Sequence, residues 1–236
     1  MTFAVLFIVA LAALAGVWLL RQGLMDRPWL ETGPMDGVAG QGIAPAPAAK
    51  IGLFVFIAVV STLLVLLVSA YSMRMEMADW SPPPRPRLLW VNTFVLVGAS
   101  IALHRATASA RRGDREGVAA NLLAGAGASL LFVVGQLLAW RQLAAAGYLP
   151  ANNAADAFFY LITAVHGLHL MGGLVALART GVKLRRHVQM ESLRLSVELC
   201  ATYWHFLLVA WLLLFGTLSF SPSFDWLVAL CTAPFR

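Results

Sequence analysis

The chain has 236 residues, of which 60% are hydrophobic and only 12% are charged. About a quarter of the residues of a soluble domain are charged, so the composition excludes an ordinary soluble protein and indicates an all-α membrane protein. The net charge of +6 does not predict nucleic-acid binding, because the basic residues fall between apolar segments. There they set the orientation of the chain and meet anionic lipid headgroups.

Six apolar segments are candidates for transmembrane helices, since a crossing needs roughly 20 apolar residues. They cover residues 2–20, 51–73, 88–103, 119–140, 157–178 and 197–220. The third is the shortest, so it must continue toward His104 or cross nearly upright. The first lacks a basic region before it and a cleavage pattern after it, which favours a retained helix over a signal peptide.

The spacing of these segments predicts four parts. Residues 1–20 form an N-terminal transmembrane helix, and residues 21–49 are rich in Gly, Ala and Pro, which is typical of a flexible linker. This linker tethers the first helix loosely to a compact bundle over residues 50–220. Residues 221–236 form a tail whose apolar part is too short to cross a bilayer.

The basic residues predict the orientation. Twelve of the 17 fall around the first, third and fifth connections, and five lie on the opposite side. Positive charge is enriched in cytoplasmic loops, so the linker is predicted to be cytoplasmic and both termini periplasmic.

Polar side chains within the apolar segments are the candidate functional residues, because ionisable groups in a membrane are costly. His166 and His169 lie three residues apart, so they share nearly one helix face. The run Tyr203-Trp204-His205-Phe206 holds a third histidine. Cys200 and Cys231 have no metal-ligand spacing and are interpreted as inert thiols.

Two further positions carry polar groups near the ends of segments. Gln136 and Trp140 are four residues apart near the outer end of the segment 119–140. Glu198 is placed at the cytoplasmic start of the last helix, where a negative charge suits the helix dipole.

Three interpretations of the histidines remain open. They could ligate haem or a metal ion, since neutral imidazole binds iron and copper well. They could relay protons, although residues 51–220 offer no acid at mid-membrane depth. The favoured interpretation is that the histidines, Gln136 and Thr163 form hydrogen bonds between helices or to a lipid or partner, each worth about 0.6–2 kcal/mol.

Five motifs in order resemble those of subunit III of the haem–copper respiratory oxidases, the cytochrome c oxidase type. The resemblance covers residues 50–220, which are about 70% of the chain. The motifs are KIGLFVF at 50–56, PRLLWVNT at 86–93, GQLLAW at 135–140, Phe159 with HGLH at 166–169, and Glu198 with YWHF at 203–206 and Trp211.

The resemblance implies a subunit that holds no redox centre itself. Haems and copper would belong to partner subunits, with catalytic subunit I and subunit II as neighbours in a bacterial inner membrane. This chain would bind phospholipid and support O₂ reduction and proton translocation. His166, His169, His205, Glu198, Gln136, Trp140, Tyr203 and Trp204 would then be structural, lipid-contact or inter-helix residues, and none would be catalytic or metal-binding.

Two departures from the family keep alternatives open. Val60 and Leu208 stand where the family often has carboxylates, so roles that depend on those acids do not carry over. The runner-up is a subunit III-like accessory protein of a nitric oxide reductase system. An alternative of another class is an independent b-type haem cytochrome that uses His166, His169 and His205.

Overall fold

The structure is a computed structural model that describes residues 48–75, 77–84, 87–186 and 188–220. The predicted helix over residues 1–20, most of the predicted linker and the predicted tail lie outside these ranges. The chain divides into two compact units, residues 1–66 and 67–236.

Five α-helices make up nearly all of the described chain. They are α2 (Ala48–Met75), α3 (Leu88–Arg111), α4 (Arg115–Ala145), α5 (Ala154–Arg185) and α6 (Met190–Phe220). Each is long and apolar enough to cross a membrane. The all-α class and five of the predicted spans are therefore confirmed, while the total of six with a tethered first helix stays a prediction.

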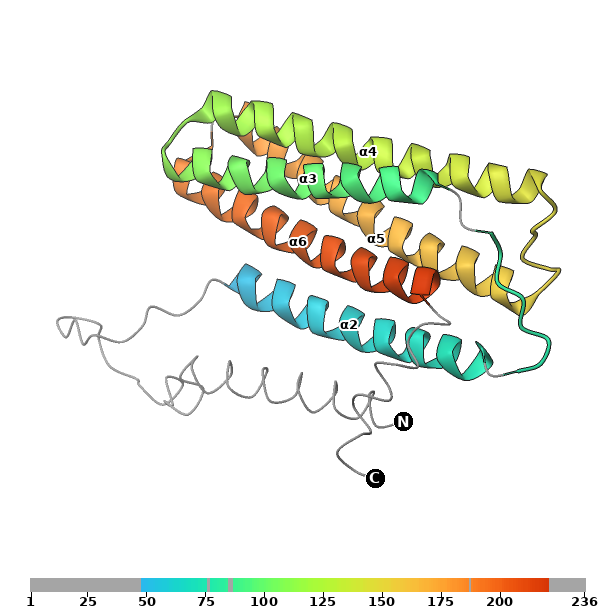
Figure 1. The fold of residues 1–236 in the computed structure, drawn as a ribbon. Helices are drawn as coiled ribbons and strands as arrows, with labels where there is room; N and C mark the ends of the chain where they lie inside the picture. The colour runs from blue at the N-terminus through green and yellow to red at the C-terminus, as the bar shows by residue number, and fades with distance from the viewer. Residues whose placement is uncertain (1–47, 76, 85–86, 187, 221–236) are drawn as a thin grey trace, which may run out of the picture. The chain divides into compact units, whose positions relative to one another are not determined.

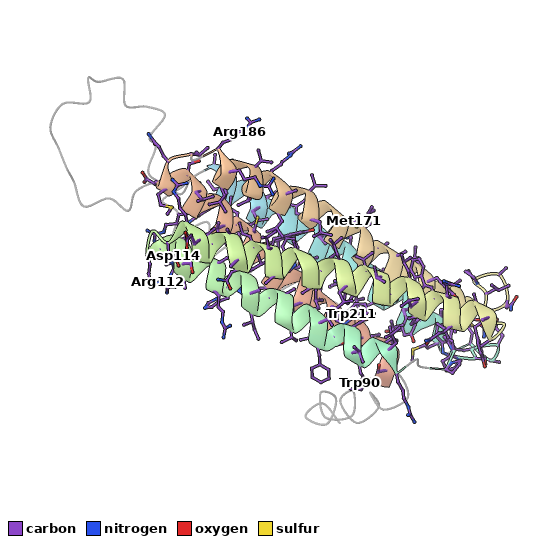
Figure 2. All side chains as sticks on the ribbon, turned by 90° about the horizontal axis from the view of Figure 1, so that it is seen from above. Trp90, Arg112, Asp114, Met171, Arg186 and Trp211 are labelled. Atoms are coloured by element: carbon purple, nitrogen blue, oxygen red, sulfur yellow. The ribbon has the colours of Figure 1, made fainter. Side chains whose placement is uncertain are left out.

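Helices α3 to α6 form a closed ring of four. Each packs against two neighbours: α3 on α4 and α6, and α5 on α4 and α6. The short connections make consecutive helices antiparallel, so the α3–α4 and α5–α6 loops share one end of the ring (Figure 1). Arg112, Asp114 and Arg186 lie together at this end in Figure 2; we call it the basic end.

Two helices extend beyond the apolar segments that predicted them. Helix α3 continues to Arg111, so Arg105, which the sequence places in the third connection, is helical. Alanine and arginine favour helix, and a long arginine side chain can reach the headgroups from within a helix. The helix stops before Gly113, whose φ of 77° suits glycine.

Helix α6 likewise begins at Met190, seven residues before its predicted apolar start. Glu191, and not Glu198, therefore occupies its first turn. Helix ends can extend past the hydrocarbon into the headgroup region, where hydropathy gives no signal.

Large side chains fill the inside of the ring. Trp204, Trp211 and Phe132 are each no more than 1% exposed. On the outside, Phe94 and Leu168 are both 71% exposed, as expected of helices that face lipid or other subunits.

The segment before α3 is fixed by contacts at the end opposite the basic end. The ring of Tyr71 on α2 lies 5.1 Å from that of Trp80 and 5.8 Å from that of Phe158. Arg74 donates to both carboxylate oxygens of Asp79, which lowers the pKa of Asp79. These contacts order the turn that leads out of α2.

Candidate functional site

Three tryptophan indoles cross-link the ring of helices by hydrogen bonds to hydroxyl groups. Each indole Nε1–H donates to a serine or threonine Oγ on another helix. The pairs are Trp140 on α4 with Thr163 on α5 at 3.0 Å, Trp204 on α6 with Ser129 on α4 at 2.9 Å, and Trp211 on α6 with Thr93 on α3 at 3.0 Å.

Each of these hydroxyls is oriented by its own helix. Ser129, Thr93 and Thr163 donate to the carbonyl four residues earlier, at 2.7, 2.9 and 2.8 Å. A hydroxyl has one donor and two acceptor sites, so the indole N–H meets a free lone pair. Both polar groups of each pair are satisfied without water, as the interior of a membrane protein requires.

His166 lies inside the ring and is 3% exposed. Its imidazole packs between two aromatic rings, with ring centres 5.7 Å from Phe132 and 5.1 Å from Trp211. Its Nε2 is buried and has no hydrogen-bond partner within the described part of the chain. The contacts of its ring with Phe132 and Trp211 are aromatic, and the predicted hydrogen bond of this histidine stays a prediction.

Gln136 is buried beside Asn92 of α3, whose Nδ2 lies 3.5 Å from its Oε1. This distance is at the limit of a hydrogen bond. The preceding Gly135 makes the approach possible, because a Cβ there would overlap the Asn92 amide. Helices α3 and α4 therefore approach each other closely where the polar pair lies.

Tyr203 and Trp204 pack α6 against α5. The Tyr203 hydroxyl donates to the His169 carbonyl at 3.0 Å, and the His169 Nδ1 lies 2.8 Å from the Val165 carbonyl of its own helix. A Cβ on Gly173 would lie 2.9 Å from the Tyr203 ring and 3.0 Å from the Trp204 ring. A glycine is needed at this crossing because the two aromatic rings occupy the space of a side chain.

His205 faces outward from α6, beside α3. Its Nδ1 lies 2.6 Å from the Ser100 Oγ, and its ring centre is 5.7 Å from that of His104. Sequence analysis did not single out Ser100 or His104.

Glu198 bridges α6 and α3 near the basic end. Its Oε1 lies 3.2 Å from Arg194 Nε and 3.5 Å from Arg111 Nε, and the side chain is 19% exposed. The interpretation that it complements the dipole at a helix start was wrong, because α6 begins eight residues earlier. Its neighbours in the structure are two arginines.

The structure does not bring the three histidines into one site. His166 is inside the ring, His205 is on its outer surface, and the His169 ring lies against its own helix. Among the described residues, no three His, Cys, Asp or Glu side chains gather closely enough to hold a metal ion. Cys200 is buried with its sulfur 3.4 Å from the Thr180 hydroxyl, and Cys231 lies outside the described residues.

Several interior polar residues were missed by sequence reasoning. Asn92 and Thr93 are adjacent on one apolar helix and face different neighbours, Gln136 on α4 and Trp211 on α6, so no shared face marked them in the sequence. Ser129 gave no signal either among the alanines and glycines around it. Asp156 is 3% exposed in the first turn of α5.

The helical bundle is also the part of the chain that matches known proteins. The family model described as cytochrome c oxidase subunit III matches residues 49–222. The probable cytochrome c oxidase subunit 3 of Mycobacterium tuberculosis (strain ATCC 25618 / H37Rv) is 33% identical over 149 residues, which are 60% of this chain and 71% of that protein.

Two further relatives match somewhat more of the chain. The cytochrome c oxidase subunit 3 of Synechocystis is 30% identical over 171 residues, 70% of this chain and 72% of that protein. That of Thermostichus vulcanus is 28% identical over 174 residues, 71% and 85% of the two chains. The family match covers the described helices except Ala48, the first residue of α2, and this multi-pass membrane protein belongs to the cytochrome c oxidase subunit III family.

Proposed function

We propose that this chain is the non-catalytic subunit III of a bacterial haem–copper terminal oxidase that reduces O₂ to water. It would stabilise the catalytic subunit I in an inner-membrane complex that also contains subunit II. The observation that carries this proposal is the use of the interior polar groups: three indole–hydroxyl bonds and the His166 stack hold helices together. A membrane scaffold needs such contacts, because lipid offers no hydrophobic driving force between helices.

Phospholipid binding is the second part of the proposal. Arg112 and Arg186 are exposed at the basic end of the ring (Figure 2), and Lys183 is exposed in the last turn of α5. Anionic headgroups are attracted to such clusters, and the apolar outer faces offer contact to the acyl chains. With the basic end in the cytoplasm, both termini would be periplasmic.

The test is purification of a tagged chain from its native membrane, followed by identification of its companions and an absorption spectrum. We expect oxidase subunits to co-purify and to carry all of the haem, while the chain expressed alone gives no Soret band. A Soret band of the isolated chain that disappears in His166→Leu or His205→Leu would overturn the scaffold role and favour the b-type cytochrome.

The nitric oxide reductase alternative rests on Val60 and Leu208, the two positions without the family's carboxylates. The same purified complex distinguishes it. We expect consumption of O₂, and a complex that reduces nitric oxide but not O₂ would replace the oxidase assignment.

A further inference from the structure

Three of the eight methionines of the chain alternate at the C-terminal end of α2, where the sequence reads Met73-Arg74-Met75-Glu76-Met77. Met73 lies in the last turn of the helix, and Met75 is its last residue. The side chains of Met73 and Met77 are 70% and 57% exposed, whereas Met75 is half-buried. Most of the surface of these two thioether side chains is therefore not used for packing on the described chain.

Met73 and Met77 lie on the same side of this helix end. The chain keeps turning after the last helical residue, because the Met77 backbone N–H donates to the Arg74 carbonyl at 3.3 Å. Side chains four residues apart in such turns are neighbours, with Cβ atoms about 6 Å apart. Met75 is two residues from each of them, a spacing that places it on a different side. Met73 and Met77 therefore form a pair, and we call them the methionine pair.

The turn that carries Met77 is fixed to the helix that carries Met73. The Trp80 backbone N–H donates to the Met77 carbonyl at 3.1 Å. The Trp80 ring lies 5.1 Å from the ring of Tyr71, which is buried on α2 two residues before Met73. A pair that is held together in this way loses less conformational freedom when it binds a ligand.

The charges beside the methionine pair allow a cation to approach. Arg74 lies between the two methionines in the sequence, and its positive charge would repel such an ion. Its two terminal guanidinium nitrogens donate to the two carboxylate oxygens of Asp79. This bidentate ion pair compensates the charge of Arg74.

The methionine pair lies at the level of a charged group near one end of a long helix. Lys50 and Arg74 are 24 positions apart near the two ends of α2, which corresponds to about 36 Å along the axis. The hydrocarbon core of a bilayer is about 30 Å thick, so both charged groups can reach the headgroups. Met73 and Met77 flank Arg74 and are therefore accessible to ions from the water.

Two thioethers favour one class of ion. Thioether sulfur is a soft ligand that selects Cu(I), whereas Mg²⁺ and Ca²⁺ prefer oxygen. With metal–sulfur bonds of about 2.3 Å, two sulfurs on opposite sides of one ion are about 4.6 Å apart. The three rotatable bonds of each methionine let a neighbouring pair of side chains reach this separation.

We propose that Met73 and Met77 form a binding site for monovalent copper, with one thioether from each side chain as the ligands. The ion is held without a change of its oxidation state, so the site needs no electron donor or acceptor. The proposal goes beyond the proposed function and does not depend on it. If the two methionines serve only as contacts for acyl chains, they will not respond to Cu(I).

A titration observed at the methionine methyl groups tests the site. The full chain is expressed without partner subunits, labelled with ¹³C at the methionine methyls, and titrated in detergent micelles with Cu(I) under ascorbate and without oxygen. Single Met→Leu variants assign the resonances. We expect the signals of Met73 and Met77 to shift together. Those of Met75 and of Met171, which is 47% exposed on α5 (Figure 2), should not shift. Zn²⁺ should shift none of them.

Single substitutions test whether the two sulfurs bind one ion. Met73→Leu should raise the Cu(I) concentration that shifts Met77 by about tenfold or more, because the second ligand of a chelate binds at a high effective concentration. Met77→Leu should have the same effect at Met73, and Met75→Leu should change neither. Circular dichroism verifies that each variant keeps its helices.

Three results would overturn the proposal. The first is no shift at Met73 and Met77, and the second is a shift at only one of them. The third is an equal shift at Met75 or Met171, which would show adventitious binding of copper to any accessible thioether.

The titration uses the chain alone, so its result is separate from the test of the proposed function. If oxidase subunits co-purify with the chain but its methionines ignore Cu(I), the site is absent and the function stands. If Cu(I) binds to the methionine pair but no oxidase subunit co-purifies, the site stands and the proposed function fails.

Discussion

At the scale of single residues, the interior of the ring is held by hydroxyl groups that serve two partners. Thr93, Ser129 and Thr163 each donate to their own helix and accept from an indole of another. This arrangement leaves neither the hydroxyl nor the indole unsatisfied, so the cost of burying polar groups in a membrane is offset locally.

Ser129→Ala tests this role. The substitution leaves the buried Trp204 Nε1–H without an acceptor, and we expect a loss of about 1 kcal/mol in the free energy of unfolding. Unfolding of the purified protein in mixed detergent micelles measures it. Ser72→Ala is the matched control, because Ser72 also bonds to its own helix but is exposed. Equal losses for both variants would contradict a special role for the indole contact.

His166→Leu separates packing from polar contact. The imidazole is buried with an unpartnered Nε2, so an apolar side chain of similar size removes a desolvation cost together with the aromatic contacts. We expect thermal stability close to that of the wild type and unchanged haem content of the complex, measured by melting and by absorption. A loss of several kcal/mol in the free energy of unfolding is roughly what breaking a buried polar network costs. Such a loss would show that His166 also has a hydrogen-bond partner, in addition to its aromatic contacts.

Some of the polar residues within the helices could be singled out from the sequence, but their partners could not. Gln136, Trp140 and Trp204 stand out in apolar helices, where a polar group needs a reason. Ser129 and Ser100 do not stand out, since a lone serine can satisfy itself on its own helix. The indole acceptors became visible only when the rotations of the helices were fixed.

At the scale of helices, the ends follow headgroup chemistry and not hydropathy. The apolar segments predicted where α3 and α6 cross the membrane, but both helices continue toward the basic end, as far as Arg111 and Met190. The extension of α3 brings Arg111 within 3.5 Å of Glu198. The hydropathy signal ended too early to reveal this contact.

The crossing of α5 and α6 depends on one of two adjacent glycines. In Gly173→Ala, the new methyl carbon would lie 2.9 Å from the Tyr203 ring and 3.0 Å from the Trp204 ring. Overpacking of this kind costs about 1–3 kcal/mol of stability. Gly172→Ala is the control, because a Cβ there meets nothing within 4 Å. We expect the first variant to lower the unfolding temperature and the second to leave it unchanged or raised. A larger effect at Gly172 would mean that α5 is rotated.

At the scale of the whole molecule, composition and apolar length were sufficient to predict membrane helices, and the ring was not predictable from them. Helices α4 and α5 are apolar on nearly all sides, so hydrophobic periodicity does not tell which face meets a neighbour. The neighbours are set by close approaches at Gly135 and Gly173 and by the indole bonds. These are short-range features of shape that appear only once two helices are side by side.

The orientation of the ring in the membrane can be tested by an experiment that checks the fold and the positive-inside rule independently. Single cysteines replace Glu116 and Gln189 near the two connections at the basic end, and Ala151 in the α4–α5 connection, all exposed. Cys200 and Cys231 are first replaced by serine. In intact cells, or in spheroplasts, a membrane-impermeant maleimide should label Ala151→Cys only. Glu116→Cys and Gln189→Cys should react after permeabilisation, because positive charge keeps their end in the cytoplasm.

The labelling results at the three positions also constrain one another. Because the α3–α4 and α5–α6 connections share one end of an antiparallel ring, positions 116 and 189 must behave alike whichever way the protein faces. Labelling of both from outside, with Ala151→Cys protected, would reverse the orientation and leave the fold intact. Labelling of only one of them would be incompatible with the ring itself, since one of the intervening helices would then not cross the membrane.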